Sequence, residues 1–150
     1  MRDDLKSRIT TLTDYYHTKY RLLTTLSNNE TELLYSLKAG NSEKVDVLLD
    51  DDQDTIEKIN MIDLQMQNET DAFVRMAGIT SGSFETYIGT LDDECVNEVL
   101  VLKKSIRDLL DEIYEKREEA NRLMAVELKK TAEDIEGLML MRKIRFTRQD

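Results

Sequence analysis

The sequence predicts an all-α fold, an elongated antiparallel bundle of three long helices with coiled-coil-like packing in which the third helix is longest. The 150-residue chain contains no proline, and three of its five glycines (Gly78, Gly82 and Gly89) lie in one short stretch. The residues that interrupt helices most strongly are therefore concentrated in that stretch. Elsewhere, apolar residues recur at spacings of three and four, the period of a helix with one buried face.

The first helix is expected over residues 3–38. Lys19 and Glu30 interrupt an otherwise apolar face whose members alternate steps of four and three, as in a coiled coil: Leu5, Ile9, Leu12, Tyr16, Lys19, Leu23, Leu26, Glu30, Leu33 and Leu37. Ser27-Asn28-Asn29-Glu30 also has the form of a capping box that begins a new helix. Because the apolar phase continues across it, the sequence favours one continuous helix.

The segment Gly40-Asn41-Ser42 is expected to end the first helix and begin the second. Glycine suits the left-handed position after a helix end, and Asn or Ser caps the next helix. So short a connection makes the two helices antiparallel. The second helix is expected over residues 43–77, with one broad apolar stripe formed by Val45, Leu48, Leu49, Ile56, Ile59, Ile62, Met66, Phe73 and Met76.

Residues 78–90 form the long connection. Ser83 is expected to cap a short turn whose apolar residues, Phe84, Tyr87 and Ile88, pack over the bundle end. Thr90 is expected to cap the third helix, over about residues 91–144. The apolar face of its first half consists of Cys95, Val99, Leu102, Ile106, Leu109, Ile113 and Ala120. The whole chain, residues 1–150, is expected to form a single domain.

The third helix is predicted to outrun its neighbours. At 1.5 Å per residue it would measure about 80 Å, against about 52 Å for each of the others. The excess covers residues 127–144 and is rich in apolar side chains, namely Leu128, Ile135, Leu138, Met139, Leu140, Met141 and Ile144. Uncovered apolar surface marks interaction sites, and methionine adapts to more than one ligand shape. We therefore predict partner binding here.

Three other arrangements account for the same residues. The end of the third helix folds back onto the bundle, or the tail is disordered, or a second copy of the chain covers it.

Composition and residue content exclude several functions. The net charge of −10 repels nucleic acid and anionic membranes, so neither nucleic-acid binding nor stable membrane insertion is expected. The single histidine and single cysteine, His17 and Cys95, cannot build a zinc or di-iron site. The acidic run at residues 50–54 resembles a calcium loop, but Thr55 and Met61 replace its required Gly and Glu. We expect no metal, no cofactor and no catalytic site.

The N-terminus lacks the apolar run of a secretory signal, and no apolar stretch approaches the roughly 20 residues of a membrane span. A cytoplasmic location is expected.

The order of these features resembles the FlgN family of bacterial flagellar export chaperones. The resemblance is carried by Leu37-Lys38-Ala39-Gly40-Asn41-Ser42-Glu43-Lys44-Val45, a long helix ending at Gly78, Phe84-x-x-Tyr87-Ile88, and Asn121-Arg122-Leu123-Met124 in the third helix. It implies a long-helix bundle in the bacterial cytoplasm that binds a hook–filament junction protein and holds it for the type III export apparatus. Glu118 stands where the family often has a second asparagine.

The resemblance also implies that the late part of the third helix binds the substrate. Together with the projecting segment, it gives the predicted partner-binding residues: Asn121, Met124, Leu128, Ile135, Leu138, Met139, Met141 and Ile144. The partner segment is expected to be an amphipathic terminal end of the junction protein.

Two competing functions stay open. One is a structural or adaptor coiled coil that self-associates. The other is an all-helical enzyme of the chorismate mutase kind, which builds its site from Arg and Glu inside a bundle. The sequence argues against the enzyme, because the seam charges Lys19, Glu30 and Asp52 look too scattered to converge.

Overall fold

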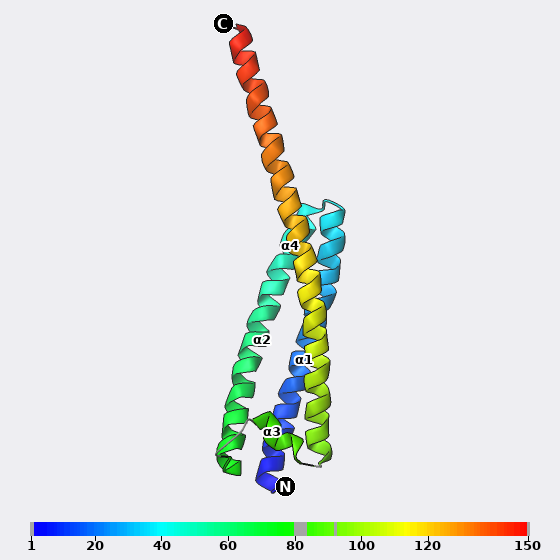
Figure 1. Cartoon of the computed structure of the whole chain (residues 1–150), viewed down its shortest axis with the longest axis vertical. Coiled ribbons are helices and arrows are strands. Elements are labelled where there is room, and N and C mark those ends of the chain that lie inside the picture. The colour runs from blue at the N-terminus through cyan, green and yellow to red at the C-terminus, as the bar shows by residue number, and fades with distance from the viewer. Residues whose placement is uncertain (1, 80–83, 92, 150) are drawn as a thin grey trace.

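The computed structural model describes residues 2–79, 84–91 and 93–149, with residues 142–149 described by their backbone only. It consists of α1 (Asp3–Lys38), α2 (Ser42–Ala77), α3 (Phe84–Gly89) and α4 (Glu94–Gln149) (Figure 1). The described residues include no strand, so the predicted all-α class is confirmed. The predicted description as three helices is incomplete, because the short turn expected in the connection is a fourth helix, α3.

The first connection forms as the sequence predicts. Gly40 adopts a left-handed φ of 69°, and the Asn41 side chain accepts a hydrogen bond of 3.2 Å from the backbone N–H of Lys44. These are the glycine end and side-chain cap that separate two helices with almost no loop. The helix α1 is continuous through Ser27, so the alternative start at the capping box does not occur.

The helix α4 begins later than predicted. Thr90 does not cap it, because the Thr90 hydroxyl donates instead to the carbonyl oxygen of Tyr87, at 2.6 Å. Asp93 takes this place, since its Oδ1 accepts a hydrogen bond of 2.9 Å from the backbone N–H of Cys95. Aspartate at this position also complements the positive end of the helix dipole. The other predicted cap, Ser83, lies outside the described residues.

The long helices α2 and α4 both pack against the third long helix, α1. It runs antiparallel to α2 and parallel to α4 and packs along both, whereas α2 and α4 make almost no close backbone approach to each other. The main core lies along α1 and includes the fully buried Ile9, Leu12 and Leu23. A smaller cluster of Leu33, Leu48 and Ala120 joins all three helices near the α1–α2 turn. The predicted bundle is therefore open on one side.

The short helix α3 closes the opposite end of the bundle. Its residues Phe84 and Ile88 are buried, and Phe73 of α2 meets Phe84 edge to face with ring centroids 5.2 Å apart. Tyr87 makes a similar contact with Phe73 at 6.0 Å. Edge-to-face pairs of this kind stabilise the packing beyond the area that they bury. The predicted placement of this turn over the bundle end is confirmed.

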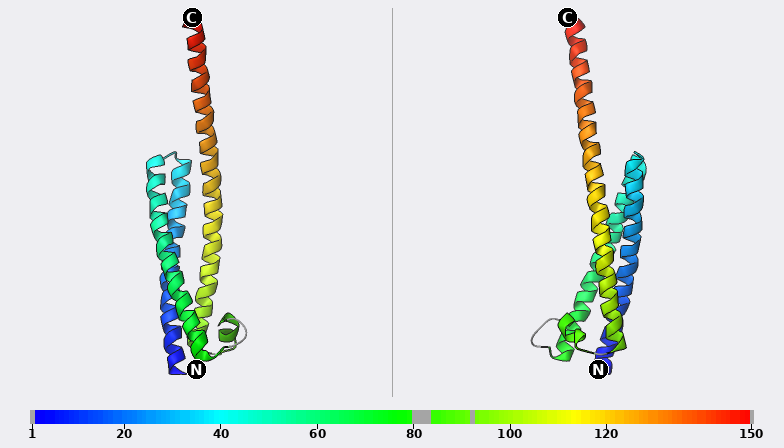
Figure 2. Two further views of the ribbon diagram at one scale, coloured as in Figure 1. Left: turned by 90° about the vertical axis from the view of Figure 1, so that its left-hand side faces the viewer. Right: turned by 45° about the vertical axis from the view of Figure 1, so that its right-hand side comes forward.

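Beyond the α1–α2 turn, α4 continues alone as one straight helix (Figures 1 and 2). It extends to Gln149, five residues past the predicted end at residue 144. The described part does not fold back onto the bundle. We call residues 128–149 of α4 the overhang.

Candidate partner-binding surface

The overhang carries apolar side chains that no other part of the described chain covers. Leu128 is 72% exposed, Leu138 63% and Met141 61%. Along the bundle, α4 buries Val99, Leu102, Ile106, Ile113 and Ala120. Steps of three and four lead from Ala120 through Met124, Leu128, Thr131 and Ile135 to Leu138. Residues so spaced share one helix face, so the face that packs on α1 continues uncovered along the overhang.

The predicted site residues fall into two groups. Asn121 is exposed beside the bundle, and Met124 is half-buried against the cluster of Leu33, Leu48 and Ala120. The remaining described members stand on the overhang and are exposed: Leu128, Ile135, Leu138, Met139 and Met141. Ile144 lies among the residues whose side chains are not described. The structure thus brings Met124 and Leu128 together at the base of the overhang, while Ile135, Leu138, Met139 and Met141 project beyond it.

An apolar hollow lies at the base of the overhang. It has a volume of about 310 Å³ and is lined by residues from both sides of the α1–α2 turn and from α4, including Leu37, Val45, Leu49, Met124 and Leu128. The size suits one large apolar side chain. Sequence reasoning missed it, because its walls come from three separate helices.

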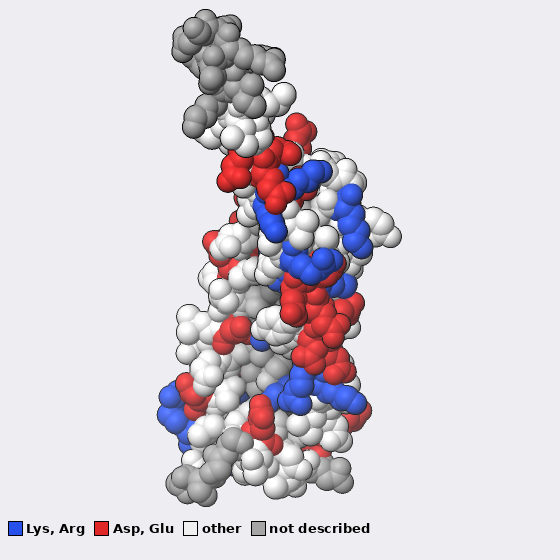
Figure 3. Space-filling view, turned by 45° about the horizontal axis from the view of Figure 1, so that its top comes forward, with Lys and Arg blue, Asp and Glu red and all other residues white. Residues whose placement is uncertain are grey.

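Charged side chains gather where α4 leaves the bundle. Figure 3 shows acidic and basic side chains there, followed by a short uncharged patch before the residues drawn in grey. In the sequence, the uncharged run on the overhang is residues 137–141, which follow the charged residues nearer the bundle.

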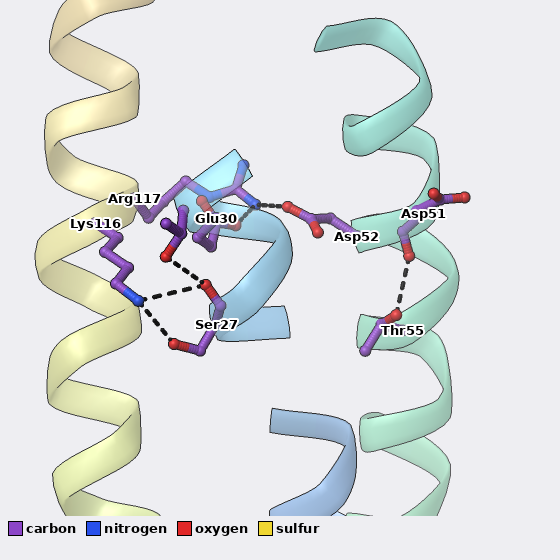
Figure 4. A network of polar contacts seen from close by, with 8 residues as sticks. Ser27, Glu30, Asp51, Asp52, Thr55, Lys116 and Arg117 are labelled. Carbon is purple, nitrogen blue, oxygen red and sulfur yellow. Dashed lines mark hydrogen bonds and ion pairs between the residues drawn. The ribbon is translucent and has the colours of Figure 1, made fainter. Parts of the chain in front are cut away.

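A second feature, within the bundle, joins all three long helices through polar groups. Arg117 of α4 donates to both Asp52 Oδ2 of α2, at 2.8 Å, and Glu30 Oε1 of α1 (Figure 4). Lys116 donates to the Ser27 hydroxyl at 2.9 Å. Glu30 and Asp52 are almost completely buried, whereas the Arg117 side chain is 30% exposed. We call Glu30, Asp52 and Arg117 the buried charge cluster.

The expectation that the seam charges do not converge is wrong for Glu30 and Asp52. Lys19 is elsewhere, paired with Asp63 at 2.7 Å. Sequence reasoning also missed Arg117, although it lies four residues after Ile113 and three before Ala120, a seam position. A basic residue on the buried face of one helix, together with acidic residues on the buried faces of the two other helices, is the sequence signal for such a cluster.

The buried charge cluster holds two carboxylates against one guanidinium. Glu30 Oε2 and Asp52 Oδ1 are buried and have no hydrogen-bond partner among the described residues. Burial raises the pKa of Glu30 to about 7, and the neighbouring Asp52 adds to the rise while Arg117 opposes it. Glu30 therefore gains or loses a proton near neutral pH.

A trough runs from this cluster toward α3. Its floor is α1, and its two walls are α2 and α4. The upper part has a volume of about 490 Å³ and is mainly apolar, with Leu23, Leu26, Ile56, Ile59, Leu110 and Ile113 beside the polar Lys19, Glu30, Asn60, Asp63, Tyr114 and Arg117. A lower hollow of about 370 Å³ shares Asp63 and reaches Phe84 and Lys103. We call the two together the trough.

Other chemistry is sparse. Over the described ranges, His, Cys, Asp and Glu side chains form no group suited to holding a metal ion. His17 pairs with Glu98 at 2.9 Å on the surface. Among the helices as described, none has the length and apolar character to cross a membrane.

Comparisons with known proteins returned no matching family model, no matching curated protein and no matching solved structure. The resemblance to the FlgN family stays a prediction.

Proposed function

We propose that this protein is an export chaperone that binds a flagellar hook–filament junction protein in the bacterial cytoplasm and keeps it unassembled until the type III export apparatus takes it. The overhang of α4 is the proposed binding surface. One observation carries the proposal: the apolar face that α1 covers along the bundle continues without cover over the overhang. The family assignment itself rests on the sequence resemblance.

The proposed mechanism is helix pairing between two molecules. An amphipathic, otherwise disordered end of the junction protein lies along Leu128, Ile135 and Leu138 and takes the place that α1 occupies lower on α4. The hollow at the base of the overhang receives one large apolar side chain of the partner. Ordering the partner's end costs conformational entropy, which keeps the affinity moderate and permits release.

The buried charge cluster does not favour the enzyme alternative. Two carboxylates outnumber the one guanidinium, so the cluster repels the dianionic kind of substrate that a chorismate mutase binds. Arg117 is also committed to Glu30 and Asp52.

The test measures whether variants of the overhang still bind the hook–filament junction protein of the same bacterium. Leu138→Glu and Met141→Glu place a charge on the proposed surface and are expected to abolish co-purification and the heat of binding in calorimetry. Leu140→Glu is the matched control, because Leu140 is similarly exposed but lies about 200° around the helix from Leu138. Circular dichroism checks that helix content is unchanged. Binding that survives both test variants rules out this surface.

A further inference from the structure

Two buried carboxyl groups, those of Glu30 and Asp52, meet at a single atom. Both accept a hydrogen bond from Arg117 Nη2, so one nitrogen atom joins α1 and α2 to α4 (Figure 4). Each carboxyl group also has one buried oxygen, Glu30 Oε2 and Asp52 Oδ1, that meets no donor within the described part of the chain. Buried polar atoms are normally hydrogen-bonded, so this pair of adjacent anions lacks a donor.

We infer that Glu30 and Asp52 share one proton, and that loss of this proton loosens the contact between α2 and α4. A carboxylate only accepts hydrogen bonds, whereas a protonated carboxyl group also donates one. A proton on either group therefore lets it donate to the other, and it leaves one negative charge beside one guanidinium. Burial, followed by the hydrogen bond between the two groups, raises the pKa of Glu30 to about 7. The inference is independent of the proposed client.

The neighbouring charged groups are directed elsewhere. On α2, the side chain of Asp51 points away from the cluster (Figure 4). On α4, Lys116 pairs with Glu112 at 3.0 Å. The other ionisable residues that line the upper part of the trough beside Glu30 and Arg117 are Lys19, Asp63 and Tyr114. Of these, Lys19 and Asp63 pair with each other.

The proton acts where α2 and α4 are joined. These two helices make almost no close backbone approach to each other. Among the ion pairs of the residues that the structure describes, the pair of Asp52 with Arg117 is the one that links them directly. Loss of the proton buries a second negative charge beside a single guanidinium, so repulsion between the carboxylates opposes this link. Because Glu30 and Arg117 line the trough, its upper part is expected to open as pH rises.

The first experiment follows the side-chain carboxyl carbons of the full chain by NMR as pH is raised. The signals of Glu30 and Asp52 are expected to move together in one step near pH 7, because a shared proton belongs to the pair. A wild type without this step, or a step that leaves the Asp52 signal unmoved, overturns the inference.

Two variants separate sharing from burial. Asp52→Asn removes the second carboxyl group and offers an amide donor, so the Glu30 step is expected to fall by about one pH unit or more. Asp51→Asn is the matched control, because Asp51 is adjacent and loses the same charge but points away from the cluster. It is expected to leave the step near pH 7. A step that stays in place in Asp52→Asn shows that burial alone raises the pKa of Glu30, and it overturns the inference.

The second experiment measures the contact between α2 and α4 by amide hydrogen exchange, corrected for the intrinsic pH dependence of exchange. Opening exposes Glu30 and returns its pKa toward 4.5. Protection of the α2 amides around residue 52 is therefore expected to fall by up to about tenfold for each pH unit between about 5 and 7. Amides around Phe73, at the other end of α2, are expected to change less.

Glu30→Gln is the control for the exchange experiment, because it keeps the size of the side chain and cannot titrate. Its protection around residue 52 is expected to stay constant over the same range. Constant protection in the wild type, an equal fall in Glu30→Gln, or an equal fall at both ends of α2 overturns the inference. Neither experiment involves a junction protein, so the shared proton and client binding succeed or fail separately.

Discussion

The two halves of α4 have the same periodicity but opposite surroundings. From Val99 to Ala120 the apolar face lies against α1, and Val99 and Ala120 are fully buried. From Leu128 to Leu138 the same face is bare. Periodicity therefore establishes that a helix has an apolar face, whereas the lengths of its neighbours decide whether that face becomes core or interaction surface.

The largest loss of stability is expected from a substitution in the buried charge cluster, which lies in the covered half of α4. Arg117→Leu removes the guanidinium and leaves two buried carboxylates facing each other, so we expect a loss of about 3–5 kcal/mol in the free energy of unfolding. Urea denaturation measures it. The exposed Arg122, which pairs with Glu119 on the same helix, supplies the control. Arg122→Leu is expected to change stability by at most about 0.5 kcal/mol. Equal losses of unfolding free energy for Arg117→Leu and Arg122→Leu would show that the buried charge cluster does not stabilise the bundle.

A matched pair of isoleucines on α4 compares packing directly. Ile106 is 6% exposed and Ile135 is 50% exposed. We expect Ile106→Ala to cost about 2–4 kcal/mol of unfolding free energy, because it removes buried methylene groups and leaves a cavity. Ile135→Ala should cost under about 0.5 kcal/mol in the isolated monomer. A large loss for Ile135→Ala under monomeric conditions would show that the overhang is covered within the same chain.

The stability of the bundle should depend on pH through Glu30. Its folded-state pKa is raised from 4.5 to about 7, so between these values the folded protein binds more protons than the unfolded chain. Stability should therefore fall as pH rises from about 4.5 to about 7, and each unit of pKa shift corresponds to about 1.4 kcal/mol.

Denaturation of Glu30→Gln over the same pH range isolates this effect. The variant lacks the titrating group, and the difference in unfolding free energy between it and the wild type should change across the interval. A constant difference would show that Glu30 does not titrate there.

The smallest effect is expected at Gly137 in the overhang. A Cβ added there meets no atom within 4 Å, and the residue is helical. Gly137→Ala should strengthen the overhang locally by up to about 1 kcal/mol through helix propensity. Slower amide hydrogen exchange near residue 137 would report it, while the urea midpoint of the bundle stays unchanged. A shift of the midpoint would mean that the overhang and the bundle unfold together.

Much of the fold follows from local signals in the sequence. Gly40 and Asn41 define the first turn, and the apolar steps from Leu5 to Leu37 define α1, because caps and periodicity act over a few residues. The predicted cap of α4, Thr90, is wrong because Thr and Asp are both common helix caps and the sequence alone does not separate them. Asp93 caps the helix instead. The buried charge cluster escaped prediction for a different reason. Residues 30, 52 and 117 meet only through the packing of three helices, which spacing within one helix does not reveal.

The continuity of α4 has a mechanical consequence. Its 56 residues form one rod of about 84 Å, with its foot beside α3 and its tip at the far end of the molecule. Such a rod acts as a lever, in which a tilt of a few degrees at the foot moves the tip by several ångströms. Repacking of Phe84 or Ile88 under the foot would therefore swing the distant end without any change in the residues there.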